Sequence, residues 1–287
     1  MSECFFVSDL HGRRERFGKL FEAIESRRPA AVFLGGDLLP HPMAAPMPGD
    51  PAGHDFVRDE LAAGFERLRE RLHGSYPRVF LILGNDDPRA EEPAVLEAAG
   101  RGVFEYAQLR RIRWGDFEVY GYAFVPPTPF QLKDWERYDV SRYVDPGCIS
   151  PEEGWRTVDV GEREPRVATI REDLDLLAGD ADLSRAVFLV HAPPYRTLLD
   201  RAALDGRMVD HAPLDVHVGS IALRRFIESR QPLLTLHGHV HESARLTGAW
   251  RDRIGRTHAF SAAHDGPELA LVRFDPGDLD SASRELL

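Results

Sequence analysis

The sequence is poor in cysteine and has no long apolar run. Its 287 residues include two cysteines, Cys4 and Cys148, which allow at most one disulfide, and Cys4 lies in an apolar run where a buried free thiol is ordinary. No uncharged apolar stretch reaches about 18 residues, and the first residues lack the basic and then apolar segments of a secretory signal. These absences predict a soluble protein of the cytoplasm, a reducing compartment, with no membrane association.

Positive charge is also scarce, because 36 Lys and Arg stand against 47 Asp and Glu, for a net charge of -11. Long nucleic acids are bound mainly by neutralising their phosphates with basic side chains, so a nuclease acting on long polyanions is disfavoured. The sequence contains neither a Gly-x-Ser-x-Gly nucleophile elbow nor a Walker phosphate loop. Since there is no internal repeat and no second linker-bounded unit, we expect a single domain over residues 1–287.

Five short apolar runs are present, and each is followed directly by a polar cluster. The runs are rich in Val, Leu and Phe, as buried strands are. They cover residues 4–7, 30–34, 79–83, 186–190 and 233–236. The clusters that follow them are Asp9-Leu10-His11, Gly36-Asp37, Gly84-Asn85-Asp86, His191 and Gly238-His239-Val240-His241. Because ligands gather beyond the carboxyl ends of strands in open α/β sheets, these distant clusters could meet at one place.

The segments between the runs predict helices and two loop insertions. Apolar spacing indicates helices around residues 17–24, 57–72, 170–177 and 223–227, and alternation of strand and helix favours a sheet with crossover helices. Segments 104–114 and 117–124 are interpreted as a hairpin around Gly115-Asp116, and 258–262 and 269–274 as closing strands. Asp87 and Pro88 are interpreted as the N-cap and first residue of a helix.

Two segments without regular patterns lie where they could border a site. Residues 40–55, rich in Pro, Gly and Met, are predicted to form either a flap or a plain loop. Residues 126–165 carry several aromatic side chains, and such a long loop is usually either a binding lid or a packed insertion. Both segments are therefore treated as loop insertions on the rim of the predicted sheet edge.

Taken singly, the polar clusters have ordinary structural explanations. A Gly-Asp pair is usually a turn former, and a lone His at a strand end is more often a hydrogen-bonded core residue. Gly238-His239-Val240-His241 is more specific, since Gly permits a turn that brings two imidazoles near one point. His237, just before this cluster, would alternate away from the site and is predicted to be structural.

All five clusters, in this order, resemble the calcineurin-like metallophosphoesterase superfamily, whose motifs are Asp-x-His, Gly-Asp, Gly-Asn-His-Asp/Glu, His and Gly-His-x-His. The resemblance implies an α/β fold, a four-layer αββα sandwich of two mixed sheets with flanking helices. It also implies a binuclear centre. One metal would be held by Asp9, His11, Asp37 and His241, and the other by Asp37, Asn85, His191 and His239. Such oxygen and imidazole ligands suit two divalent ions of Mn, Fe, Zn or Co.

The third cluster departs from the family pattern. The family places a His after Gly-Asn, where it contacts the phosphate and protonates or orients the leaving group, whereas here Asp86 follows Asn85. The resemblance makes Asn85 and Asp86 substrate-binding candidates. Asp86 would be a general acid only with a raised pKa, and two dications oppose that shift. The structural alternative is that Asp86 caps the turn entering residues 88–99.

A further candidate lies before the last metal-binding strand. His217 is predicted to be a catalytic, substrate-contacting or ligand-supporting residue, with ordinary structure as the alternative. Gly219 and Ser220 open the following helix, whose N-terminus would either hold a phosphate or be capped by the serine itself.

These features predict a metal-dependent phosphohydrolase in which a bridging hydroxide attacks phosphorus. The change at Asp86 favours a phosphodiesterase acting on a small or nucleotide-like phosphoester. One alternative is a phosphomonoesterase, including a protein phosphatase. Another is a non-catalytic scaffold with the same fold, although all seven ligand positions hold residues able to coordinate a metal.

Overall fold

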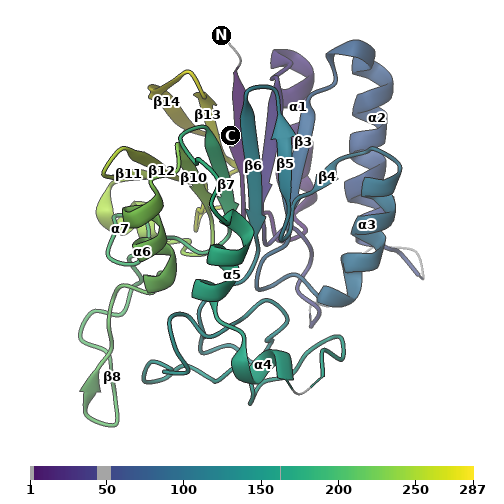
Figure 1. The fold of residues 1–287 in the computed structure, drawn as a ribbon. Coiled ribbons are helices and arrows are strands. Elements are labelled where there is room, and N and C mark those ends of the chain that lie inside the picture. The colour runs from purple at the N-terminus through teal and green to yellow at the C-terminus, as the bar shows by residue number, and fades with distance from the viewer. Residues whose placement is uncertain (1–2, 44–52, 162) are drawn as a thin grey trace.

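Two six-stranded sheets pack face to face with helices on their outer sides (Figure 1). The computed structural model describes residues 3–43, 53–161 and 163–287. The first sheet has the order β14-β13-β1-β2-β3-β4, in which β1 to β4 run parallel and β13 and β14 are antiparallel additions. Its strands are β1 (Cys4–Val7), β2 (Ala31–Gly35), β3 (Arg78–Ile82), β4 (Glu105–Tyr106), β13 (Ala270–Asp275) and β14 (Asp278–Leu286).

The second sheet has the order β11-β12-β10-β7-β6-β5, with a parallel centre and an antiparallel strand at each edge. Its strands are β5 (Arg111–Trp114), β6 (Phe117–Tyr122), β7 (Ala186–Val190), β10 (Leu234–His237), β11 (Arg251–Ile254) and β12 (Thr257–Ser261). A separate two-stranded hairpin of β8 (Met208–Val209) and β9 (Ala212–Pro213) projects from the body (Figure 1).

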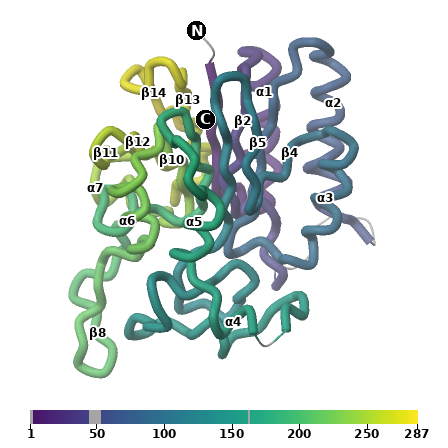
Figure 2. The backbone as a smooth tube through the Cα atoms, viewed as in Figure 1, coloured from purple at the N-terminus to yellow at the C-terminus, as the bar shows by residue number. Residues whose placement is uncertain are grey.

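The alternation of side chains along the strands explains the four layers. In β2, Ala31 and Phe33 join an apolar cluster between the sheets, whereas Val32 and Leu34 join the cluster beneath the helices. The first sheet is covered by α1 (Arg14–Arg27), a π-helix (Phe56–Ala62), α2 (Ala63–Leu72) and α3 (Glu92–Gly100). On the second sheet lie α5 (Ile170–Ala178) and α6 (Ile221–Arg230). Two further α-helices are short: α4 (Arg163–Val167) and α7 (Ser243–Thr247). The expected αββα sandwich of two mixed sheets is therefore confirmed (Figure 2).

Two local predictions were wrong, although the hairpin around Gly115-Asp116 is confirmed by the antiparallel pairing of β5 with β6. The segment 104–114 is divided between the sheets, because Leu109 takes a left-handed turn (φ 53°) after β4 has paired with β3 and before β5 pairs with β6. The helix expected from Pro88 begins at Glu92 as α3, after a 3-10 turn over Arg89–Glu91. Asp87 is not its N-cap, because its carboxylate faces the other way, into the protein.

The insertion of residues 126–165 is irregular but packed. Trp135 and Tyr138 are buried, at 1% and 3% exposure, whereas Tyr143 is 67% exposed. A buried ion pair, Lys133 Nζ to Glu136 Oε2 at 2.6 Å, lies inside the same segment. The packed alternative therefore describes Trp135 and Tyr138 better than a mobile lid does.

The other predicted insertion, residues 40–55, falls largely on residues 44–52, which lie outside the described part of the chain. Within residues 3–43, 53–161 and 163–287, none of the helices combines the length and the apolar character that a transmembrane span requires.

Candidate metal centre

The predicted ligands lie at one edge of the sandwich because of the strand directions. Strands β1, β2 and β3 are parallel neighbours, so the loops after them emerge together, and β7 and β10 are parallel neighbours in the facing sheet. Backbone hydrogen bonds join these loops: Asp9 N–H donates to Gly36 O at 2.9 Å, and Gly238 N–H donates to His191 O at 2.9 Å. Clusters that are far apart in sequence therefore meet, as expected from the sheet rule.

Four of these positions have a backbone that non-glycine residues rarely adopt. The φ angles are positive at Asp9 (58°), His11 (48°), Asp37 (52°) and His239 (73°). Each such residue costs on the order of 1 kcal/mol, and this strain persists only where the surrounding structure imposes it. The left-handed turns redirect the chain directly after each strand. Their concentration at one place is typical of a functional site.

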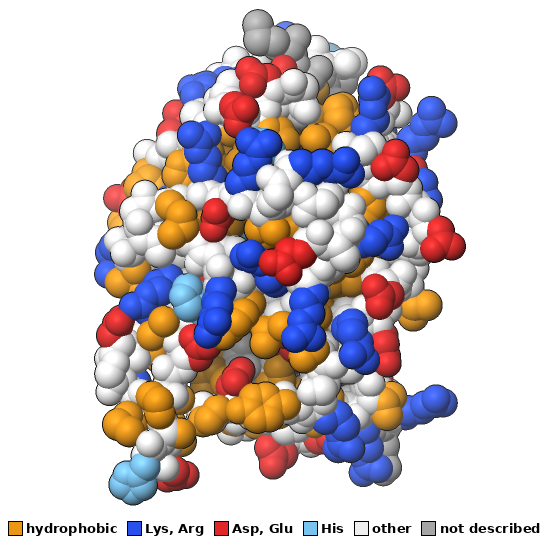
Figure 3. Space-filling model, turned by 60° about the vertical axis from the view of Figure 1, so that its left-hand side comes forward, with side chains coloured by type: hydrophobic (Ala, Val, Ile, Leu, Met, Phe, Trp, Pro, Cys, Tyr) orange, Lys and Arg blue, Asp and Glu red, His pale blue; other side chains and the backbone are white. Residues whose placement is uncertain are grey.

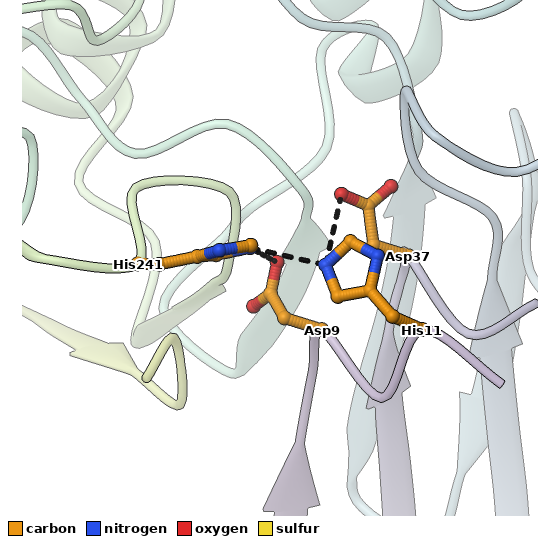
Figure 4. Close-up of side chains that lie close together, drawn as sticks. All are labelled: Asp9, His11, Asp37 and His241. Atoms are coloured by element: carbon orange, nitrogen blue, oxygen red, sulfur yellow. Dashed lines mark hydrogen bonds and ion pairs between the residues drawn. The ribbon is translucent and has the colours of Figure 1, made fainter. Parts of the chain in front are cut away.

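The first predicted ligand group converges in space (Figure 4). One ligand atom from each of Asp9, His11, Asp37 and His241 lies within 4.8 Å of all the others. His11 Nε2 and His241 Nε2 are 3.1 Å apart, and His241 Nε2 is 3.1 Å from Asp9 Oδ1. Two carboxylates and two imidazoles form a donor set that fits Mn, Fe, Zn or Co.

The second predicted group adjoins the first through Asp37. His191 Nδ1–H donates to Gly35 O at 2.7 Å, which leaves the Nε2 lone pair facing Asn85 Oδ1 at 3.1 Å and Asp37 Oδ2 at 3.2 Å. One lone pair beside two acceptor oxygens is unfavourable unless a proton or a metal cation stands between them. The His239 ring lies 5.3 Å from the His191 ring, centroid to centroid. These residues therefore also fit a cation.

The electrostatics of the cluster favour positive charge. Burial alone would lower the pKa of His191, but the Asp37 carboxylate outweighs it and raises the pKa to about 10. Burial likewise opposes protonation of His241, whose hydrogen bond and charge interaction with Asp9 raise its pKa to about 9. Burial would raise the pKa of Asp9, yet the neighbouring histidines hold it well below its usual range. The carboxylates thus stabilise cations at this edge.

Two glycines of the motifs are required by space. A Cβ at Gly84 would lie 2.7 Å from His191 Nε2, and a Cβ at Gly238 would lie 2.6 Å from Asp9 Oδ2. Both distances are too short for any side chain, so the motif glycines allow the loops to approach the candidate ligands.

Asp86 lies beside the candidate metal ligands and not at the start of a helix. Its N–H donates to Asp37 Oδ1 at 2.8 Å, and its Oδ2 lies 3.7 Å from His11 Nδ1. The capping interpretation was wrong, because α3 begins at Glu92 and the Asp86 carboxylate accepts a bond from Asn85 Nδ2 at 3.1 Å. Burial, and then the Asp37 charge, raise the pKa of Asp86. Bound dications would act in the opposite direction.

His217 lies on a different loop from the candidate ligands. Its Nδ1 is 2.8 Å from Asp200 Oδ1, and its ring lies 6.1 Å from the Tyr195 ring. Asp200 is fully buried and also accepts bonds from the amides of Thr197 and Gly219. A buried carboxylate therefore orients the half-exposed imidazole, and the catalytic role of His217 stays a prediction.

The start of α6 is not available for a phosphate. Ser220 Oγ accepts a bond from Leu223 N–H at 3.0 Å, so this serine caps the helix. The Asp139 carboxylate accepts bonds from the Ser220 hydroxyl and from the amides of Ile221 and Ala222. Of the two sequence-based alternatives, the cap is confirmed. His237 is fully buried and bonds the carbonyl of Ala192 at 2.9 Å, as a structural residue does.

Two residues near the centre were missed by the sequence reasoning. The buried Asp87 carboxylate accepts bonds from the amides of Leu38, Leu39 and Gly84. The buried Arg16 guanidinium donates to the carbonyl of Asp9. Asp87 could have been noticed, because the family motif places an Asp or Glu at this position. No local pattern distinguishes Arg16 from the other arginines of the chain.

Comparisons with known proteins agree with this geometry. A family model described as calcineurin-like phosphoesterase matches residues 4–243. The chain therefore belongs to the calcineurin-like phosphoesterase family, and its members' activity identifies it coarsely as a hydrolase of phosphoesters.

Individual relatives are distant. An uncharacterised protein of Methanocaldococcus jannaschii, MJ1162, is 39% identical over 74 residues, which are 25% of this chain and 28% of that protein. The crystal structure of TT1561 of Thermus thermophilus aligns with a TM-score of 0.56 and 16% identity over 99% of this chain and 98% of its own. Another solved structure gives a TM-score of 0.60, 16% identity and the same coverage. These structural likenesses support the fold.

Proposed function

We propose that this chain is a binuclear metal-dependent phosphodiesterase that cleaves a small or nucleotide-like phosphoester. The observation that carries the proposal is the convergence of Asp9, His11, Asp37 and His241 beside the pair of Asn85 and His191. Asp37 lies between the two groups, with Oδ2 3.2 Å from His191 Nε2 and 3.9 Å from His11 Nε2. A carboxylate in this position can serve two cations.

Two divalent cations, when bound, supply a hydroxide nucleophile and neutralise the charge that develops at phosphorus. The protein residues set the geometry. His191 is held by Gly35 O in the tautomer that directs Nε2 inward, and Asp37 Oδ1 is held by the Asp86 amide, so Oδ2 remains for the cations. We propose Mn, Fe, Zn or Co as the metals, from the donor set.

The preference for diesters rests on Asp86. A carboxylate beside two dications is a poor proton donor, so substrates with weakly basic leaving groups are favoured. Asp86 nevertheless lies beside His11 and Asn85, where it can orient a substrate. We also propose that His217, which is oriented by Asp200, contacts the substrate or supplies a proton from a loop that carries none of the candidate ligands.

The loop that carries His217 supports this assignment. His217 contacts Asp200, and the segment around Asp200 is joined to the residues directly after His241: Arg201 N–H donates to Ser243 Oγ at 3.2 Å, and Ser243 Oγ–H donates to Leu198 O at 2.9 Å. Figure 3 shows, near the base of the face that it draws, a hollow with hydrophobic side chains and an acidic one in it and basic side chains above it. Local basic side chains of this kind attract a small phosphate despite the net charge of -11.

The test is metal content and paired hydrolysis on one sample. After reconstitution with Mn²⁺, elemental analysis should give two metals per chain, and bis(p-nitrophenyl) phosphate should be hydrolysed faster than p-nitrophenyl phosphate. Faster hydrolysis of the monoester would instead support a phosphomonoesterase. Fewer than one metal per chain, together with no turnover, would support the scaffold alternative and overturn the proposal.

A further inference from the structure

A buried carboxylate that belongs to neither ligand group joins two of the ligand loops. Asp87 Oδ1 accepts a bond from Leu39 N–H at 2.7 Å, and Oδ2 accepts bonds from Leu38 N–H at 3.1 Å and Gly84 N–H at 2.8 Å. Leu38 directly follows Asp37, and Gly84 directly precedes Asn85. One side chain therefore sets the separation of the backbone segments that carry Asp37 and Asn85.

The same segment also orients the shared ligand. Asp86 N–H, one residue before Asp87, donates to Asp37 Oδ1 at 2.8 Å. Since that oxygen is engaged, the other oxygen, Oδ2, is the one directed at His191 Nε2, 3.2 Å away. A shift of the peptides at residues 84–87 would move Asn85 and Asp37 together.

The insertion of residues 126–165 holds this segment from outside the sandwich. Trp135 Nε1–H donates to Asp87 O at 2.9 Å, and the adjacent Asp134 Oδ2 accepts a bond from Arg89 N–H at 2.7 Å. The Trp135 ring is 1% exposed, packs 5.3 Å from the Phe124 ring, and has the Arg89 guanidinium 5.3 Å from its centroid. Two consecutive residues of the insertion thus bind the backbone on both sides of Pro88.

From these contacts we infer that Trp135 is a positioning residue for the metal centre, acting through the Asp87 peptide on Asn85 and Asp37. The insertion is then part of the scaffold of the second metal position, in addition to forming the rim. This inference deepens the proposed function and rests on it. It also predicts that loss of the Trp135 bond affects the two metal positions unequally. The reason is that Asp9, His11 and His241 belong to loops that the insertion does not bind through Trp135.

The test compares Trp135→Phe with Trp155→Phe. The first variant keeps an aromatic ring but removes the Nε1 donor, and the second makes the same change in the same insertion at a ring that is 38% exposed. Calorimetric titration of each protein with Mn²⁺, below its melting temperature, gives the affinity of each site, and electron paramagnetic resonance reports whether two Mn²⁺ ions are coupled.

We expect Trp135→Phe to weaken one of the two Mn²⁺ affinities about 3- to 10-fold, as loss of one buried hydrogen bond to a ligand-supporting group does. The other affinity should change less, because that ligand set shares only Asp37 with the affected segment, and Trp155→Phe should match the wild type at both sites. A merely structural role of Trp135 would lower the melting temperature without this selective change. Equal affinities in the wild type and Trp135→Phe would overturn the inference.

The outcomes also separate this inference from the proposed function. If the wild type does not bind two Mn²⁺ ions, the proposed function fails before any variant is compared. If it binds two ions and Trp135→Phe binds them equally, only the positioning role fails. Should Trp135→Phe not fold, Asp134→Asn weakens the hold on the same segment through the Arg89 amide, and unchanged affinities in that variant would overturn the inference equally.

Discussion

The two ligand groups of the candidate centre differ in exposure and in what holds them. We call Asp9, His11 and His241 the open group, because the side chains of His11 and His241 are 20% and 34% exposed. The buried group consists of Asn85 and His191, which are 4% and 0% exposed, whereas His239, the remaining residue of that predicted set, has intermediate exposure. His191 is held by a bond to the Gly35 carbonyl, whereas the imidazoles of the open group contact one another, and His241 contacts the Asp9 carboxylate. We expect an ion in the open group to exchange more easily than one in the buried group.

Removing the residue between the groups should have the largest effect. Asp37→Asn takes one negative charge from both ligand sets, so we expect turnover of the diester to fall about 1,000-fold or more, which corresponds to about 4 kcal/mol. Elemental analysis should show the loss of at least one metal. Asp116→Asn is the matched control, because that side chain is 81% exposed in the β5–β6 turn. Full metal content in Asp37→Asn would contradict the shared role.

The same substitution made in each of the two groups should have different effects on stability. His191→Gln and His241→Gln should each weaken metal binding, by about 10- to 100-fold. His191→Gln should also destabilise the chelated protein more than His241→Gln does, by roughly 1–3 kcal/mol, because it disturbs a fully buried hydrogen-bonded site. Thermal melting in chelator measures this difference. Identical melting temperatures for the two variants would show that exposure does not distinguish the groups.

In the presence of a chelator, which keeps the protein free of metal, the pH dependence of its stability should reflect a histidine from each group. The folded-state pKa values of His191 and His241, about 10 and about 9, lie above the ordinary value of 6.5. Their protonated forms therefore stabilise the fold fully below about pH 6.5, and this contribution is lost as the pH rises through about 9 to 10.

We expect the melting temperature to fall by roughly 5 °C or more between pH 7 and pH 10, since each pKa unit corresponds to about 1.4 kcal/mol. Bound Mn²⁺ should reduce this dependence, because the metal replaces the protons. A chelated protein that became more stable as the pH rose over this range would show that the cluster does not hold protons in this way. His191→Gln should retain only the part of the dependence that belongs to His241.

The smallest expected effect concerns Asp86, beside both groups. Asp86→His supplies a proton donor, so turnover should rise most for substrates with alkoxide leaving groups, by about 10-fold relative to nitrophenyl esters. The measurement is the ratio of rates for alkyl and nitrophenyl substrates. If that ratio did not move, Asp86 would not govern the leaving group. Asp86→Asn, which adds no proton donor, is the control.

Much of the fold could be predicted because buried strands and amphipathic helices leave local patterns. The runs that became β1, β2, β3 and β7 are apolar on both faces, as strands between two layers are, and β10 is fully buried but carries Thr235 and His237 on one face. Strand β14 was not predicted, because it is half-exposed and rich in charged and small polar residues. The segment 104–114 was misassigned, since a single turn at Leu109 transfers the chain between sheets.

The sequence by itself determined the order of the strand-end motifs and the residue types in them, which is sufficient to identify the family and to predict the ligand positions. Only the tertiary structure decided what Asp87 and Trp135 do. An Asp before Pro has the same local pattern whether it caps a helix or binds three amides. The direction of its carboxylate depends on Leu38 and Leu39, about 50 residues away, and therefore on how the loops pack together.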